Sequence, residues 1–432
     1  MAKATTTLFS PSPEGAGDGA THGTGILPSQ SIRGLIQNHR IEAIETIEPD
    51  QIQPASLDLR LGGVAYRVRA SFMPGREATM MDKIDQIGMH ELDITTGAVL
   101  EAGCVYIVPL LESIHLVGDL AAFANPKSST GRLDVFTRLI TDRATAFDRV
   151  ERNYHGPLFI EIAPRTFSIF VRKGSRLNQL RLRRGSPVFG QETLERLHRK
   201  APLVDTEPGR ETLREKRVGL SIDLEGEAKT GLVGFRAKKN TAVIDIDARG
   251  VYEPTDFWEP IYTKPGEGFI LDPHDFYILA TKEAVSIPPD HAAEMVAYDT
   301  DVGEFRVHYA GFFDPGFGYG KPEHASKAVL EVRAHEVPFM LEHEQIIGWL
   351  RYERLLEVPE QAYGQGIGSY YQGRPCSSAS SSSRWAEPAA AATGRPPPIV
   401  PTFAFTSACS WPCLWCSSCP SFPSACGRAA CT

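Results

Sequence analysis

The chain has 432 residues, of which 42% are hydrophobic and 23% are charged, and its formal net charge at pH 7 is −8. These values are ordinary for a soluble globular protein, and the length allows two buried cores. An acidic chain is not expected to coat nucleic acid, although it can carry a local basic pocket for a small anion. No apolar run reaches the roughly 18 residues of a membrane-spanning helix, so no membrane partner is expected.

The composition of residues 1–25, which are small, polar and rich in Gly and Pro, predicts a disordered leader. They lack the basic start and apolar centre of a secretion signal. Cys104 is the only cysteine before residue 376, whereas the other seven lie between Cys376 and Cys431. A body with one cysteine is typical of a reducing compartment, so we expect a cytoplasmic protein.

Residues 26–184 alternate short apolar runs with Gly, Pro and Asp turns, which predicts a strand-rich domain. At its start, "SQSIRGLIQNHRI" (29–41) has apolar residues at helical spacing and a serine cap region, so a helix is expected there. A charged linker follows over 185–217, with a second predicted helix in "QETLERLHRK" (191–200). Residues 218–362 are strand-rich again.

Residues 375–432 are dominated by Ser, Ala, Pro and Cys, and they contain no lysine. Such a composition offers no periodic apolar face, so we expect a disordered tail. "PCLWC" (412–416) matches half of the zinc deaminase signature, but no histidine begins the required H-x-E. Zinc is therefore not expected.

The body contains an internal repeat. The segment from Leu100 aligns with the segment from Leu271, which pairs Tyr106 with Tyr277 and Glu112 with Glu283; further along, "FIEIA" aligns with "VLEV", which pairs Glu161 with Glu331. "SLDLRLGG" from Ser56 also echoes "SIDLEGEA" from Ser221. Matches in register over about 100 residues predict two copies of one β-rich domain, because the unit is too long for a solenoid repeat.

The two copies differ in "NPKSSTGR" (125–132). This loop supplies phosphate-binding donors, although the spacing is not that of a P-loop. The donors expected to bind phosphate are Lys127, Ser128, Ser129 and Arg132, with Gln179 nearby. The second copy has Asp299 and Asp301 at the matching place, and carboxylates repel phosphate. The first copy is therefore predicted to be the phosphate half-site.

The second copy carries "VHYAGFFDPGFGYG" (307–320), a Gly-rich aromatic hairpin that is predicted to recognise a base. Its Asp314 could organise the hairpin, bond a sugar 3′-hydroxyl or orient a water molecule. The structural alternative is an aspartate that caps the turn before Pro315.

The order of five segments resembles the dCTP deaminase branch of the trimeric dUTPase superfamily, in its long two-repeat bacterial form. These segments are "IQPASLDLRLGG" (52–63), "KSSTGR" (127–132), "YAGFFDPGF" (309–317), "AVLEV" (328–332) and "YGQGIGSYYQGR" (363–374). The resemblance implies a mainly β fold, with two tandem dUTPase-like distorted β-barrel (jelly-roll-like) domains and a few short helices. It also implies self-association, with active sites between neighbouring barrels and Mg²⁺ bound through the substrate triphosphate.

The resemblance also assigns binding residues. Tyr309 and Ala310 belong to the pyrimidine hairpin, whereas Tyr363, Tyr371 and Gln372 belong to an arm (363–374) that closes over the triphosphate.

Deamination at C4 of cytosine needs an activated water and protons for the ring nitrogen and the leaving amine. One buried carboxyl group with a raised pKa can move all three. Glu331 is the first choice for this catalytic carboxyl group, because its copy also carries the hairpin, and Glu161 is the second choice. For either glutamate, the alternative is a structural role in an ion pair.

The expected reaction converts dCTP and water into dUTP and ammonia, a step toward dTTP. One alternative is a dUTPase or a bifunctional deaminase–diphosphatase in which Asp314 activates water against the α-phosphate. Another is a non-catalytic, regulatory nucleotide-binding protein.

Overall fold

The computed structural model describes residues 23–206, 212–227, 230–264, 266–296, 305–308 (backbone only), 311–320, 326–334 and 336–363. All of them belong to one contact unit, Met1–Glu387. Tyr309, Ala310, Asp299, Asp301 and the tail lie outside the described residues. None of the described helices is long and apolar enough to cross a membrane.

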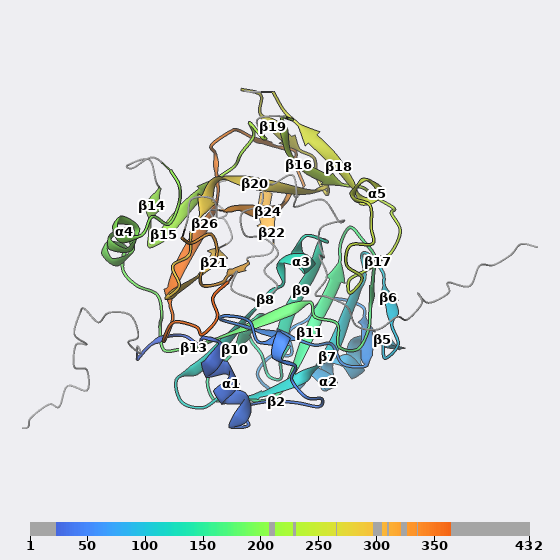
Figure 1. Ribbon diagram of the computed structural model, residues 1–432. Coiled ribbons are helices and arrows are strands. Elements are labelled where there is room, and N and C mark those ends of the chain that lie inside the picture. The colour runs from blue at the N-terminus through green and yellow to red at the C-terminus, as the bar shows by residue number, and fades with distance from the viewer. Residues whose placement is uncertain are drawn as a thin grey trace, which may run out of the picture. The chain divides into compact units, whose positions relative to one another are not determined.

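The first repeat consists of two facing groups of antiparallel strands (Figure 1). One sheet has the order β1 (Gly25–Ile26), β13 (Asn178–Arg184), β8 (Leu120–Pro126) and β10 (Arg149–Val150), with β3 (Leu57–Leu59) also on β13. The other has the order β5 (Gly88–Asp93), β4 (Val64–Val68), β7 (Val105–His115), β11 (His155–Pro164) and β9 (Val135–Thr141), with β2 (Ile41–Ala43) also on β7. β1 begins at Gly25, the last residue of the predicted leader.

The second repeat has the same plan. One sheet has the order β14 (Leu213–Arg214), β15 (Arg217–Ser221), β26 (Ile346–Arg354), β21 (His291–Val296) and β23 (Phe312–Phe313). The other has the order β18 (Trp258–Tyr262), β16 (Leu232–Ala237), β20 (Phe276–Val285), β24 (Ser326–Ala334) and β22 (Phe305–His308). A separate pair joins β19 (Phe269–Leu271) to β25 (Phe339–Leu341).

Each repeat encloses its own apolar core. The predicted mainly β fold of two tandem barrels is therefore confirmed. The described helices are short: α1 (Ser29–Gln37), η1 (Pro49–Gln51), α2 (Met80–Ile87), α3 (Ser128–Gly131), α4 (Gln191–Lys200) and α5 (Pro254–Phe257).

The two helices predicted from the sequence are α1 and α4. The expected serine cap of α1 is wrong, because its N-cap is Pro28 and no side chain caps it. In α4, Leu194 is fully buried in the core of the second repeat, so this helix of the predicted linker packs on that repeat.

The internal repeat is visible in matching hydrogen bonds. Tyr106 Oη accepts a bond of 3.1 Å from the Glu101 backbone N–H. Its counterpart Tyr277 accepts a bond of 2.9 Å from the Asp272 N–H. The two tyrosines therefore hold equivalent turns, as the alignment predicts.

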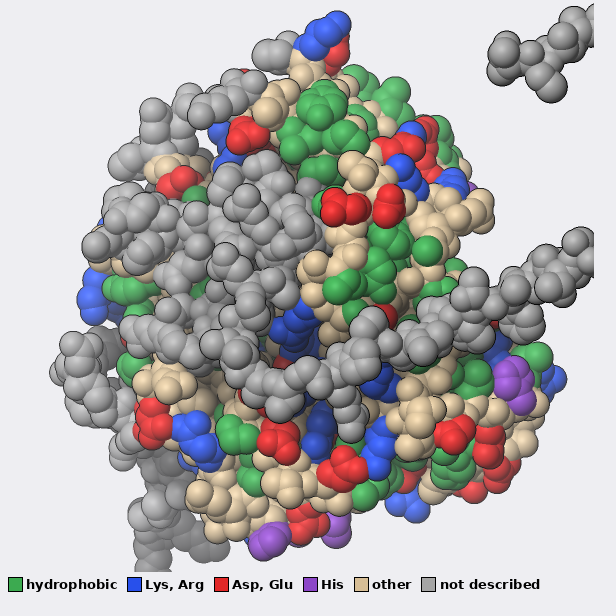
Figure 2. Space-filling model, turned by 45° about the vertical axis from the view of Figure 1, so that its right-hand side comes forward, with side chains coloured by type: hydrophobic (Ala, Val, Ile, Leu, Met, Phe, Trp, Pro, Cys, Tyr) green, Lys and Arg blue, Asp and Glu red, His purple; other side chains and the backbone are tan. Residues whose placement is uncertain are grey.

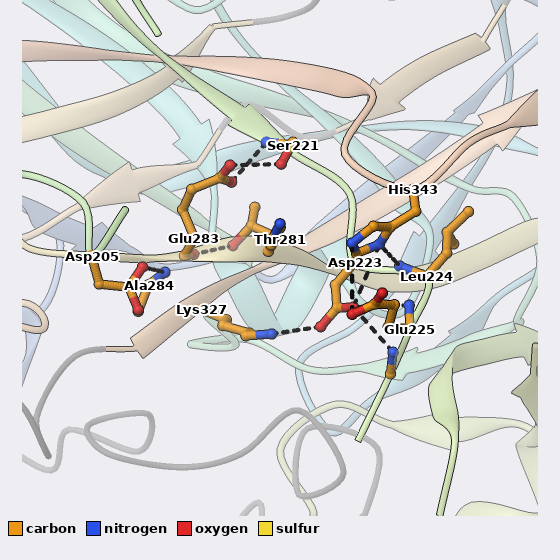
Figure 3. Close-up of polar contacts among 12 residues, drawn as sticks. Asp205, Ser221, Asp223, Leu224, Glu225, Thr281, Glu283, Ala284, Lys327 and His343 are labelled. Atoms are coloured by element: carbon orange, nitrogen blue, oxygen red, sulfur yellow. Dashed lines mark hydrogen bonds and ion pairs between the residues drawn. The ribbon is translucent and has the colours of Figure 1, made fainter. Parts of the chain in front are cut away.

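A buried glutamate shows where the sequence alignment goes out of register. Glu112 accepts bonds of 2.8 Å from the backbone N–H and from Nε of Arg60. Its counterpart Glu283 accepts bonds of 2.7 and 2.6 Å from the N–H and Oγ of Ser221 (Figure 3). Ser221 is thus the counterpart of Arg60, and the predicted echo that paired it with Ser56 is wrong by four residues.

Asp223, which the echo paired with Asp58, lies beyond the end of β15. It accepts bonds of 3.1 and 3.0 Å from the backbone N–H groups of Glu225 and Gly226, and one of 2.5 Å from Lys327 (Figure 3). These bonds fix a turn. Strand register makes Gly219 the counterpart of Asp58, so a carboxylate at that position occurs only in the first repeat.

The connection between matching strands differs most between the repeats. In the first repeat, residues 69–87 contain α2 and pack on their own sheet. In the second repeat, residues 238–257 cross to the first repeat. There β17 (Ile244–Asp245) pairs in parallel with β12 (Ile169–Val171), which also pairs with β6 (Ala98–Leu100).

Candidate functional site

The predicted phosphate loop is a short turn between β8 and β9. The Lys127 N–H and the Thr130 Oγ1 donate bonds of 2.9 and 2.8 Å to the Leu177 carbonyl, which ties the loop to the start of β13. Ser128 is exposed and Ser129 is half-buried. The two serine hydroxyls therefore remain near the surface while the backbone beneath them is fixed.

Arg132 at the end of this loop lies against Glu331 on β24 of the second repeat. The Arg132 Nε is 4.0 Å from a Glu331 carboxylate oxygen, and the two side chains are 5% and 8% exposed. The structure therefore brings the cationic residue predicted in one repeat to the carboxyl group predicted in the other.

Apolar side chains also lie beside Glu331, since Ile278 of the neighbouring strand β20 stands opposite it. Phe276 and Ile278 of β20 form a buried cluster with Phe167, which the first repeat contributes. Burial raises the pKa of Glu331 to about 8, and the nearby Arg132 guanidinium acts in the opposite direction. A carboxyl group with this pKa can both release and accept a proton near neutral pH.

The predicted aromatic hairpin is held by a residue that sequence reasoning missed. Arg181, on β13 of the first repeat, donates bonds of 3.0 and 3.3 Å to the Ala293 and Phe313 carbonyls. Its guanidinium lies 3.9 Å from the centre of the Phe312 ring and 3.7 Å from Asp314 Oδ1. A fully buried arginine of one repeat thus organises the hairpin of the other.

Asp314 follows β23 directly, and its side chain is 16% exposed. Burial raises the pKa of Asp314 to about 6, although Arg181 opposes this shift. The turn after it depends on glycine: Gly318 has φ +62°, and a Cβ there would lie 2.0 Å from the Val285 carbonyl oxygen. The Phe317 N–H closes the turn by donating a bond of 3.1 Å to the Asp314 carbonyl.

Tyr363, the first residue of the predicted arm, lies on this hairpin. Its N–H donates a bond of 2.8 Å to the Pro315 carbonyl, and its ring centre is 5.4 Å from that of Phe317. Tyr371 and Gln372 lie outside the described residues. Their predicted contact with a triphosphate therefore stays a prediction.

Gln179 lies beside the phosphate loop. It stands opposite Asn125 on β8 and Asp58 on β3, and the Ser56 Oγ donates a bond of 3.4 Å to its Oε1. Asp58, a second residue missed from the sequence, is buried and forms an ion pair with the partly exposed Lys127. The position of Asp58 in the opening motif was the available signal.

The fit to Mg²⁺ can be judged from these carboxylates. Asp58 is close enough to Asp314 to contribute to its raised pKa. Among the described residues there is no group of three or more His, Cys, Asp or Glu side chains that could hold a metal. One or two carboxylates suit a magnesium ion that takes its other ligands from water and substrate phosphates.

Glu161, the second choice for the catalytic carboxyl group, lies in a closed environment. The residue is 1% exposed, and the Ser71 hydroxyl donates a hydrogen bond to its carboxylate. Met80 and Ile84 of α2 are buried in the apolar cluster on the same sheet. Burial raises the pKa of Glu161, and Ile107, which stands opposite it on β7, belongs to the same cluster as these helix residues.

Figure 2 shows the surface near the junction of the repeats. Lys and Arg side chains gather in the hollowed centre of this face, at the height where Figure 1 places the boundary between the repeats. Positive charge in a recess favours an anionic ligand.

The fold consists of two dUTPase-like barrels. The first contributes a loop with donors of the kind that bind phosphate, and the second contributes a buried carboxyl group beside that loop. Together these features define a nucleotide-processing protein. Residues 23–186 match the family model for the N-terminal domain of 2'-deoxycytidine 5'-triphosphate deaminase, and residues 190–378 match that for its C-terminal domain. The chain therefore belongs to the dCTP deaminase family.

The chain is similar to several known members. It is 36% identical over 167 residues to a "dCTP deaminase, dUMP-forming" of Beutenbergia cavernae, covering 37% of this chain and 83% of that protein. It is 33% identical over 126 residues to a "dCTP deaminase" of Natronomonas pharaonis, covering 28% of this chain and 60% of that protein. The crystal structure of 2'-deoxycytidine 5'-triphosphate deaminase from Agrobacterium tumefaciens has a TM-score of 0.75 and 53% identity, covering 78% of this chain and 100% of that one.

Proposed function

We propose that this protein hydrolyses the C4 amino group of dCTP, giving dUTP and ammonia, without zinc. The observation that carries the proposal is the contact between Arg132 and the buried Glu331, which come from different repeats. A polyanionic nucleotide needs cationic and hydroxyl donors, and deamination needs a carboxyl group that can exchange protons near neutral pH.

Glu331 acts as the proton carrier. Its carboxylate removes a proton from water as the oxygen attacks C4, and the carboxyl group then protonates the ring nitrogen N3. A second proton passes from the added hydroxyl group through Glu331 to the amino group, which leaves as ammonia and restores the C4 carbonyl. The raised pKa of Glu331 supports this role, because proton transfer is fastest when the carrier's pKa lies near the working pH.

The first repeat binds the triphosphate. Ser128, Ser129 and Gln179 donate hydrogen bonds to phosphate oxygens, and Arg132 supplies a planar cationic fork. When Mg²⁺ is bound through the triphosphate, it neutralises phosphate charge. Asp58 and Asp314 are the residues that would hold that ion. The arm that begins at Tyr363 then closes over the nucleotide.

A second candidate reaction continues from dUTP to dUMP. It is favoured by the relatives named "dCTP deaminase, dUMP-forming" and by Asp314, whose raised pKa suits a base that activates water against the α-phosphate.

The test is to incubate the purified full chain with dCTP and Mg²⁺ and to resolve dCTP, dUTP and dUMP over time. Accumulation of dUTP supports the deaminase, whereas direct appearance of dUMP supports the bifunctional enzyme. Binding of dCTP without turnover would overturn both and favour a regulatory nucleotide-binding protein.

A further inference from the structure

A second ion pair lies beside the Arg132–Glu331 contact, with its charges reversed. On β24, Arg333 follows Glu331 by two residues and therefore projects from the same face of the strand. Asp134 follows Arg132 by two residues in the turn after α3. Arg333 Nη2 pairs with Asp134 Oδ2, and these side chains are 8% and 1% exposed.

Further hydrogen bonds fix this pair. Thr166 Oγ1 donates a bond of 2.5 Å to Asp134 Oδ2 and accepts one of 3.0 Å from Arg333 Nη2. Arg333 Nη1 donates a bond of 2.5 Å to the His274 carbonyl. A planar guanidinium that bonds a carboxylate, a hydroxyl and a carbonyl group together can occupy few positions. These contacts therefore lock β24 to the first repeat.

The ion pair is specific to the junction that contains Glu331. The alignment that matches Glu161 with Glu331 places Ala163 at the position of Arg333. Alanine cannot form an ion pair, and the first repeat covers its own glutamate with α2 instead. The charged pair thus occurs where the two repeats must be held together around a carboxyl group.

We propose that Arg333 is a positioning residue that fixes Glu331 relative to Arg132 by bonding Asp134 and Thr166. The inference rests on the proposed role of Glu331. The distance of 4.0 Å between Arg132 and Glu331 is too long for a hydrogen bond, so this contact alone does not fix the position of the Glu331 carboxyl group. The neighbouring Arg333–Asp134 pair is held by direct hydrogen bonds and can fix that position.

An activity test separates positioning from simple stabilisation. Asp134→Asn keeps the size of the side chain but removes its charge, so kcat for dCTP should fall roughly tenfold to a hundredfold, as expected when reacting groups are displaced by about 1 Å. KM should change less than kcat. Arg333→Lys, which keeps the charge but not the planar fork, should restore only part of the activity lost in Arg333→Met.

The matched control is Arg172→Met. Arg172 also joins the repeats, through bonds of 2.6 and 2.7 Å to Asp245 and Asp247 near β17. This variant should lower the midpoint of thermal unfolding while kcat stays near wild type. If Asp134→Asn lowers stability to a similar extent and leaves kcat unchanged, the pair is only structural and the proposal is wrong. Thr166→Val is a milder substitution in case Asp134→Asn does not fold.

A second measurement does not depend on deamination. The coupling between Arg132 and Glu331 can be obtained from a double-mutant cycle of Arg132→Ala and Glu331→Gln, followed by urea unfolding. We expect this coupling to fall by at least half when the cycle is repeated in the Asp134→Asn or Thr166→Val background. An unchanged coupling would overturn the positioning role. An inactive wild type with the expected loss of coupling would overturn the proposed function alone.

Discussion

Glu161 and Glu331 occupy matching positions in the two repeats, yet their surroundings differ. The connection at 69–87 folds back with α2 and covers Glu161 within the first repeat. The corresponding connection at 238–257 leaves its own repeat and pairs with β12. Glu331 instead lies beside Arg132 of the first repeat, and Phe167 of that repeat packs with Ile278, which stands opposite Glu331. The comparison indicates that the duplication placed Glu331 at the junction of the repeats and enclosed Glu161 within the first repeat.

The largest expected effect distinguishes the two glutamates directly. Glu331→Gln should lower the deamination rate about 10²- to 10⁴-fold, the range typical of a general acid–base group, while nucleotide binding stays largely intact. Glu161→Gln should lower the rate by less than about tenfold, because that carboxyl group is closed within its own repeat. Steady-state assays with dCTP measure both. A loss below about tenfold for Glu331→Gln would contradict its assignment.

The next largest expected effect concerns phosphate binding by the two repeats. Arg132→Ala should weaken dCTP binding by about 2–3 kcal/mol, the value expected for a lost charge-assisted contact. Asp299→Ala, at the matching place in the second repeat, should leave the affinity unchanged. Calorimetric titration of both variants with dCTP measures the difference, and an equal response would refute the division into half-sites.

The pH dependence of stability offers a smaller effect with a definite sign. Because the pKa of Glu331 is about 8 in the folded protein, the folded state binds more protons than the unfolded state between the ordinary glutamate pKa and about 8. The contribution of Glu331 to stability therefore falls as pH rises through this window. Glu331→Gln should gain unfolding free energy relative to wild type between pH 5 and pH 8, by about 1.4 kcal/mol for each unit of raised pKa that is removed.

Glu161→Gln should show a gain of the same sign, since burial also raises the pKa of Glu161. Urea unfolding at several pH values measures both variants. A gain for Glu331→Gln that does not grow with pH would mean that Glu331 is ionised in the folded protein.

The smallest effect concerns the tail. A chain that ends at Arg374 should keep its unfolding temperature and show an equal or lower apparent KM for dCTP. The composition of the last 58 residues predicts disorder, and a disordered tail should hinder closure of the arm. Thermal unfolding and steady-state kinetics test this together. A drop of several degrees, or loss of activity, would show that the tail belongs to the folded unit.

Much of the fold could be predicted from the sequence. Alternating apolar runs encode strands, and the repeat directed attention to Glu331 and to the loop that ends at Arg132. The register at Ser221 was missed because a short sequence echo competed with the strand pairing that decides the alignment.

The residues that hold the repeats together could not be predicted in the same way. The second repeat also has an arginine, Arg351, at the position that matches Arg181, so comparing the two copies did not single out Arg181. In the structure their roles differ, because Arg351 pairs with Glu294 inside its own repeat. Arg333 did leave a signal, since its counterpart is Ala163. Its partner Asp134 could not be predicted, because the contact joins residues of two domains and the spacing of residues along the chain does not show which of them meet.

The central claim is that Arg132 and Glu331 of one chain complete one site. Its most direct test is to co-express differently tagged Arg132→Ala and Glu331→Gln chains, isolate any mixed assembly and measure dCTP deamination. The account predicts that the mixed assembly is no more active than the separate variants, because neither chain contains both Arg132 and Glu331. Recovery to a substantial fraction of the wild-type rate would show that the site forms between chains, and would contradict the assembly of the site within one chain.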